Sequence, residues 1–201
     1  CLSSGISGVF NSANVAKAEL EERYPDRKIY VVDSLAASMG EGLLAYYASK
    51  MQLEGKTIDE VYQWLQDNKL HLCHWFTVDD LNHLKRGGRV SSAAALFGTM
   101  LGIKPVLHVD DAGHLIPVAK IRGRRQSLDS LVAHMEQTVT NPEEQVIFIS
   151  HGDCEGDALL VADEITRRFG NRDIHLNYVG PVIGNHSGPG TVALFFLGSK
   201  R

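Results

Sequence analysis

The sequence is poor in the features that mark secreted, metal-binding and membrane proteins. Its three cysteines in 201 residues, Cys1, Cys73 and Cys154, are widely spaced and form no CxxC pair. This spacing argues against a disulfide framework and a zinc site, and it favours a reducing compartment. No run approaches the roughly 20 apolar residues needed to cross a bilayer, and the amino end lacks the layout of a secretory signal. We therefore expect a cytoplasmic protein without an integral membrane span.

The sequence also lacks a large excess of either positive or negative charge. Lys and Arg number 20 against 24 Asp and Glu, which gives a net charge of -4. Such a chain has no broad cationic field for nucleic acid, so we expect none as a partner. Hydrophobic residues make up 44% and charged residues 22%, as in ordinary globular proteins.

The hydrophobic pattern predicts an α/β fold with two lobes. In the first part it indicates helices over 12–22, 36–51 and 57–68 and strands over 28–33 and 71–78. This rhythm is typical of a parallel-sheet α/β lobe. Further on it indicates strands over 103–109, 114–121, 145–150, 173–179 and 191–197 and helices over 127–139 and 155–169. We predict a partial parallel-sheet lobe over residues 1–78 and a mixed or antiparallel lobe over residues 79–201.

The first segment that could carry chemistry is the loop at residues 3–8, with the sequence SSGISG. Its glycines allow backbone N–H groups to converge, and the following helix adds partial positive charge at its amino end. The loop therefore suits a carboxylate or a phosphate. The alternative interpretation is an ordinary helix N-cap.

The second segment is the loop at residues 180–190, GPVIGNHSGPG, with four glycines and two prolines in eleven residues. It carries His186 between Asn185 and Ser187. A histidine can donate a hydrogen bond to an oxyanion near neutral pH, and a loop so restricted in its backbone is typical of a binding site.

The third segment, residues 79–91, begins with acids and ends in Lys85, Arg86 and Arg89. Together with Arg122, Arg124 and Arg125, these residues could form a basic patch for phosphates or an acidic partner. A solvated charged face is an equally good interpretation.

Two other chemistries fit poorly. The nucleophile elbow of serine hydrolases needs G-x-S-x-G, and around Ser7 the last glycine is displaced by one position. His71 and His74 would point to opposite faces of a strand, and no compact set of acids or cysteines joins them. We expect no metal site.

Taken together, the segments resemble the DegV family of fatty-acid-binding proteins. The matching motifs are SSGxSG at residues 3–8, the small-residue run SLAASMG at 34–40, DDLxxLKRGGR at 79–89 and GPVIGxHxGPG at 180–190. The resemblance implies that a long-chain fatty acid is bound between two lobes, with no chemistry performed on it and no cofactor. In some bacteria, family members deliver the acid to a fatty acid kinase for acyl-phosphate synthesis. The alternatives are a Ser/His hydrolase and a binder of a small phosphorylated metabolite.

The resemblance also implies roles for individual residues. The carboxylate would contact Ser4, with Ser3 and Gly5 beside it, and His186 would lie in the same hydrogen-bond network. The residues that would shape the pocket or its loops are Ser7, Gly8, Ala37, Ser38, Met39, Gly184 and Asn185. Contacts with the kinase or a phosphate would fall to Lys85, Arg86, Arg89 and Arg122.

The chain departs from the family pattern in three respects. Val9 and Phe10 stand where the family usually has Thr and Tyr, and Asn185 and Ser187 stand where Thr often flanks the histidine. Family members also have a segment before the SSGxSG loop that this chain, opening at Cys1, does not include. We expect its absence to leave the acyl tunnel partly open.

Overall fold

The computed structural model describes residues 1–79, 81–91 and 102–201. Within these residues, one mixed sheet has the strand order β3-β2-β1-β6-β4-β5. Only β4 and β5 pair in parallel, and the other neighbours are antiparallel. The strands are β1 (Leu72–Thr77), β2 (Ile103–Val109), β3 (Leu115–Arg122), β4 (Ile147–His151), β5 (Ile174–Tyr178) and β6 (Val192–Leu197).

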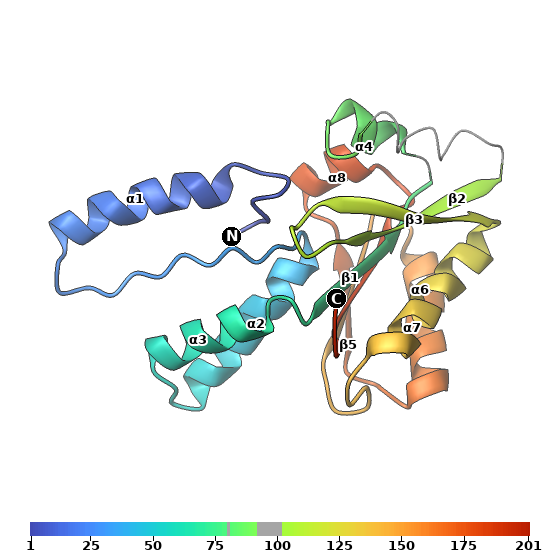
Figure 1. Cartoon of the computed structure of the whole chain (residues 1–201). Coiled ribbons are helices and arrows are strands. Elements are labelled where there is room, and N and C mark those ends of the chain that lie inside the picture. The colour runs from blue at the N-terminus through green and yellow to red at the C-terminus, as the bar shows by residue number, and fades with distance from the viewer. Residues whose placement is uncertain (80, 92–101) are drawn as a thin grey trace.

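Helices cover both faces of this sheet (Figure 1). On one face α6 and α7 pack against each other and against the strands, and on the other face α2 packs against β1, β4 and β6, with α3 beside it. The short helices α4 and α8 lie together beyond the ends of the strands, at one end of the sheet. The described helices are α1 (Val9–Arg23), α2 (Met39–Leu53), α3 (Ile58–Asn68), α4 (Asn82–Arg86), α6 (Arg124–Thr138), α7 (Glu155–Phe169) and α8 (Pro181–Ser187).

The alternation of side chains along the central strands builds two cores. On β6, Ala193 and Phe195 face α2, whereas Leu194 and Phe196 face α6 and α7. Since successive strand residues point to opposite faces, one strand serves both cores. This explains why β6 is apolar along its whole length, with five of its six residues buried.

Several predicted elements are confirmed. Strand β2 and helix α7 have the predicted bounds, and β2 and β3 form the expected antiparallel hairpin. Helix α3 begins at the expected capping box, in which the Thr57 hydroxyl accepts from the Glu60 N–H and the Glu60 carboxylate accepts from the Thr57 N–H. The α/β class with a mixed sheet is confirmed as well.

The strand predicted over 28–33 is wrong. Extended backbone becomes a strand only when a ladder of hydrogen bonds pairs it, and here the only described backbone alongside is the first residue of the chain. The Cys1 ammonium donates to the Val32 carbonyl over 2.8 Å, and the Ser34 N–H donates to the Cys1 carbonyl over 3.1 Å. In Figure 1 this segment runs back beside α1, a helix that has no buried residue.

Strand β1 also differs from its predicted surroundings. We assigned it to the first lobe, but it lies in the middle of the sheet, between β2 and β6. Residues 1–78, all of which the structure describes, therefore contribute helices and one central strand to the sheet of residues 79–201, and they form no parallel sheet of their own. Among the described residues, no helix is long and apolar enough to cross a membrane.

Candidate ligand-binding site

The candidate site lies at the end of the three central strands of the sheet, where β1 and β4 end and β6 begins. The register places Phe76 of β1 and Ser150 of β4 on either side of Ala193 of β6. These three side chains point to the α2 face, because Phe76 and Ala193 belong to the core under α2 and Ser150 lies two positions after its member Phe148. A small residue between two larger ones leaves a hollow in the floor of the sheet.

Helices α4 and α8 form the roof of this hollow, and two of the sequence motifs meet there. A Cβ atom on Gly87 would overlap the Nδ1 atom of His186, and one on Gly188 would overlap the ring of His83. Gly188 also has a φ of 80°, in the region that favours glycine. The glycines of the two motifs are therefore needed for the close approach of α4 to α8.

Floor and roof enclose a cavity of about 100 Å³. Most of its lining is apolar, as expected for a site that binds an apolar ligand. The described apolar lining residues are Leu2, Ile6, Ala37, Phe76, Leu84, Leu115, Val179, Val182, Ile183 and Ala193. The polar ones are Ser7, Ser38, His74, Arg89, Ser150, His186, Ser187 and Thr191.

Three polar atoms of the lining are buried without a hydrogen-bond partner among the described residues. They are Nδ1 of His74, Nδ1 of His186 and the hydroxyl oxygen of Ser187. Leaving such an atom unpaired costs about 1–3 kcal/mol, so buried polar groups are paired in most native structures. For His74 and Ser187, a polar group of a bound molecule could offset this cost, whereas Nδ1 of His186 faces Gly87.

Ser38 lies in a strained backbone conformation at the start of α2. Its φ of 55° and ψ of -135° are unfavourable for any residue with a Cβ atom. Its hydroxyl is 3.2 Å from the hydroxyl of Ser150. Strain of this kind is common at binding sites, because the surrounding fold must hold the residue in place.

Arg89 connects the end of the segment at residues 79–91 to the loop at residues 3–8. Its Nε donates to the carbonyl of Ile6 over 3.2 Å, and its Nη1 donates to the carbonyl of Gly87 over 2.5 Å. Arg89, which we predicted to contact the kinase or a phosphate, lies in the cavity lining. Its charge thus lies beside the cavity, where it favours an anionic ligand.

Of the four predicted carboxylate contacts, one lies in the described cavity lining. His186 lines the cavity, whereas Ser3, Ser4 and Gly5 are outside its described lining. Ser3 is fully buried, and its hydroxyl donates to the carbonyl of Gly113 over 2.8 Å. Ser4 is exposed, and its N–H donates to Oδ1 of Asp33.

The other predicted residues are also divided. Ser7, Ala37 and Ser38 line the cavity. The described lining does not include Gly8, Met39, Gly184 or Asn185. The side chains of Lys85, Arg86 and Arg122 are exposed, and an Arg86 Nη2 lies 3.1 Å from Nδ1 of His83.

Sequence reasoning missed His74, Ser150, Ser187 and Thr191 as lining residues. The spacing of His74 and Phe76 already placed both on one face of a strand. That this face meets Ser150 depends on β6 inserting between β1 and β4, and local sequence gives no signal for such pairing.

His74 is neutral in the folded protein. Burial, and after it the charge of Arg201, lowers the pKa of its imidazole to about 3. Its ring packs against Phe195 and Phe76, with centroids 4.5 Å and 5.4 Å apart. The floor of the cavity thus offers a hydrogen-bonding group without a charge.

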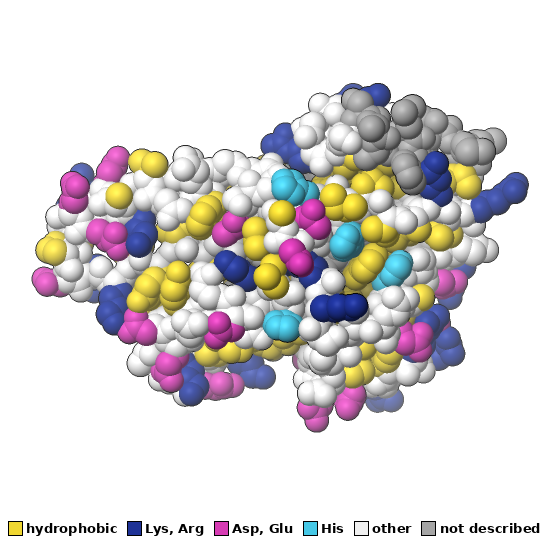
Figure 2. Space-filling view, in the orientation of Figure 1, with side chains coloured by type: hydrophobic (Ala, Val, Ile, Leu, Met, Phe, Trp, Pro, Cys, Tyr) yellow, Lys and Arg dark blue, Asp and Glu magenta, His cyan; other side chains and the backbone are white. Residues whose placement is uncertain are grey.

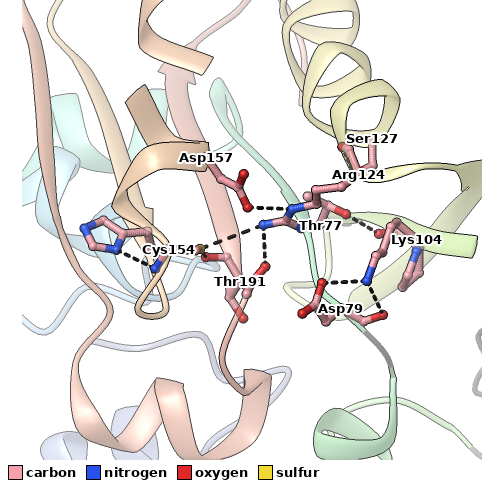
Figure 3. Close-up of polar contacts among 11 residues, drawn as sticks. Thr77, Asp79, Lys104, Arg124, Ser127, Cys154, Asp157 and Thr191 are labelled. Carbon is pink, nitrogen blue, oxygen red and sulfur yellow. Dashed lines mark hydrogen bonds and ion pairs between the residues drawn. The ribbon is translucent and has the colours of Figure 1, made fainter. Parts of the chain in front are cut away.

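A second polar cluster lies at the same end of the sheet, beyond the end of β1 and the start of β6 (Figure 3). Nε of Arg124 is 2.7 Å from Oδ2 of Asp157, and its Nη2 donates to the carbonyl of Gly190 over 2.7 Å. Nearby, the Lys104 ammonium is 2.7 Å from Oδ1 of Asp79. Arg124 therefore holds the loop before β6 to α7 and is not an exposed member of the basic patch.

The geometry gives no support to the serine-hydrolase alternative. The Ser7 hydroxyl accepts from the Val9 N–H and the Ser38 and Ser150 hydroxyls bond each other, and among the described residues no hydrogen bond joins any of these hydroxyls to a histidine. No group of three or more His, Cys, Asp or Glu residues that could hold a metal was found among the described residues.

The fold and the cavity define an α/β protein with a mostly apolar ligand site at the ends of the central strands of its sheet. The family model described as "Uncharacterised protein, DegV family" matches residues 1–199. The chain belongs to the DegV family.

Three relatives illustrate this membership. A DegV domain-containing protein of Clostridium perfringens is 52% identical over 199 residues, which cover 99% of this chain and 68% of that protein. The crystal structure of a DegV family protein from Eubacterium eligens loaded with heptadecanoic acid is similar at 25% identity, with a TM-score of 0.91 over 98% of this chain and 70% of that one. The Streptococcus pneumoniae fatty acid kinase B3 protein loaded with linoleic acid is 22% identical, with a TM-score of 0.91 over 98% of this chain and 69% of that one, and this likeness shows the fold.

Proposed function

We propose that this protein binds a long-chain fatty acid in the cavity, with the acyl chain against the apolar lining and the carboxylate beside His186. The observation that carries the proposal is the coincidence of unpaired polar atoms with an otherwise apolar cavity. Ser187 supplies an unpaired hydroxyl on α8, His186 lines the cavity beside it, and Arg89 supplies a positive charge. A buried carboxylate needs such partners, because without them its transfer from water is strongly unfavourable.

Two hydroxyls compete for the role of carboxylate partner. The family resemblance favours Ser4, whereas the cavity presents Ser187, which is buried with its hydroxyl unpaired among the described residues. We propose Ser187 on this geometry. If it is right, Ser187→Ala weakens binding more than Ser4→Ala does; the opposite order would return the role to Ser4.

The apolar part of the proposal depends on the small floor residue. Each methylene removed from water contributes about 0.8 kcal/mol, so access to the cavity dominates affinity. Ala193 is buried between Phe76 and Ser150, and a larger side chain there would fill the space. We expect Ala193→Phe to abolish fatty acid binding.

Titration with a fluorescent fatty acid tests the site. A hydrogen bond to a charged group contributes about 1.5–3 kcal/mol, so His186→Ala should weaken binding roughly 10- to 100-fold. His114→Ala is the matched control, because this histidine is outside the described cavity lining and its side chain is 54% exposed. Equal affinities for both variants and the wild type would refute the carboxylate assignment.

We further propose that the protein is a carrier and not an enzyme, and that it presents the acid to a fatty acid kinase through a basic surface that includes Lys85, Arg86 and Arg122. Figure 2 shows Lys and Arg side chains around α4 and near the adjoining ends of β2 and β3 on the face drawn. Lys85 and Arg86 of α4 and Arg122 of β3 are exposed there. The kinase itself is implied by the family resemblance.

A pull-down with a fatty acid kinase tests this second part. Arg86→Ala should weaken kinase binding and leave fatty acid affinity unchanged. Arg172→Ala is the matched control, since this exposed arginine precedes β5 and lies at the end of the sheet opposite to the cavity. Unchanged kinase affinity in the Arg86 variant would remove this residue from the docking surface.

A further inference from the structure

The cavity has a second polar position, on its floor, that the carboxylate site does not use. His74 is 4% exposed and lines the cavity, and its Nδ1 has no hydrogen-bond partner among the described residues. Its neighbours Phe76 and Phe195 offer only aromatic rings. An apolar side chain at this position would complete the wall at no polar cost, so the imidazole calls for a partner in the cavity.

This position is separated in depth from the carboxylate site. His186 belongs to α8, at the edge of the sheet where β1 ends with Thr77. His74 lies three positions before Thr77 along β1, which is roughly 10 Å further into the sheet. A ligand whose carboxylate is at His186 therefore brings the middle of its chain, and not its head, to His74.

The chemistry of His74 restricts the group that it can recognise. Because burial keeps the imidazole neutral, it can donate or accept one hydrogen bond at each nitrogen but offers no charge to a second carboxylate. A hydroxyl both donates and accepts, so it suits either tautomer. A plain alkyl chain, by contrast, would leave Nδ1 unpaired in an apolar and now water-free space.

We infer that the cavity prefers acyl chains carrying a mid-chain hydroxyl group over unsubstituted chains of the same length, with His74 as the residue that sets this preference. The inference rests on the proposed function, because it assumes that the carboxylate lies beside His186. It adds the class of fatty acid that the site selects.

Competition binding with purified protein tests the inference. Three ligands of equal length suffice: stearic acid, its derivative with a mid-chain hydroxyl, and its derivative with the hydroxyl next to the carboxyl group. The wild type should bind the mid-chain derivative roughly tenfold more tightly than stearic acid, corresponding to about 1.4 kcal/mol. The derivative with the hydroxyl near the head should show no such advantage, since its hydroxyl cannot reach His74.

Variants assign the preference to one side chain. His74→Leu should lose the preference and bind stearic acid at least as well as the wild type, while His74→Gln, which keeps hydrogen-bonding capacity, should retain part of it. His108→Leu is the matched control: Nδ1 of His108 is also buried and unpaired among the described residues, but the ring lies on the opposite face of the sheet. It should keep the full preference.

The outcomes separate this inference from the function on which it rests. Tight binding of stearic acid with no preference for the mid-chain hydroxyl would overturn the inference alone, and it would mean that enclosed water satisfies His74. A preference that survives in His74→Leu would also overturn it. Failure of the wild type to bind any of the three acids would overturn the proposed function, and the inference with it.

Discussion

The strained backbone at Ser38 allows a prediction about stability in which glycine and alanine exchange their usual order. Both Ser38→Ala and Ser38→Gly remove the hydroxyl that bonds Ser150, so this loss is common to the two variants. They differ in the backbone. Alanine keeps a Cβ atom at a φ of 55° and a ψ of -135°, whereas glycine adopts these angles freely.

The magnitude follows from two opposing terms. Relief of the strain favours the glycine variant by about 1–3 kcal/mol. The greater freedom of glycine in the unfolded chain disfavours it by about 0.4–1 kcal/mol. Ser38→Gly should therefore be more stable than Ser38→Ala by about 1 kcal/mol, which corresponds to roughly 2–4 °C in Tm for a chain of this size.

Ser150, the other partner in the same hydrogen bond, supplies the control. It lies within β4 and has no positive φ. There the ordinary order applies, and Ser150→Gly should be less stable than Ser150→Ala by about 0.5–1 kcal/mol. Urea denaturation of the four variants measures both differences. An alanine variant at Ser38 as stable as the glycine variant would refute the assignment of strain.

Two further predictions concern the roof and the floor of the cavity. Gly87→Ala should displace His186, because the new methyl group would overlap Nδ1, and we expect a loss of about 1–3 kcal/mol of stability together with weaker fatty acid binding; an unchanged urea midpoint would contradict the close approach of α4 and α8. For His74, the unfolded chain takes up a proton below the ordinary pKa of 6.5 while the folded protein does so only near 3. As the pH is lowered through this window, the free energy of unfolding of the wild type should therefore fall by about 1.4 kcal/mol per pH unit more than that of His74→Leu. If the free energy of unfolding fell equally in the two proteins between about pH 7 and about pH 5, the imidazole would not be buried in the neutral form.

The sequence predicted the elements far better than their assembly. Local patterns, which can be read directly from the sequence, determine the bounds of β2 and α7, the capping box at Thr57 and the hairpin between β2 and β3. The segment 28–33 has the composition of a buried strand but lacks a partner among the described residues, and composition alone does not supply one.

The candidate site shows the same division. The motifs around Gly87 and His186 were recognisable as special backbone, and the structure joins them in one contact. His74 and Ser150 had no such signal, since they become neighbours of the cavity only through the order β1-β6-β4. Ser4 was favoured by its motif, yet its side chain is exposed and outside the described lining.

The central claim is that a fatty acid lies in the cavity with its carboxylate on α8. The most direct test is a crystal structure of the chain grown with a long-chain fatty acid. We predict that the carboxylate lies at a hydrogen-bonding distance of about 2.6–3.2 Å from His186 or Ser187 and that the acyl chain passes over Ala193. An acid bound elsewhere, or a cavity that stays empty at saturating ligand, would contradict the account.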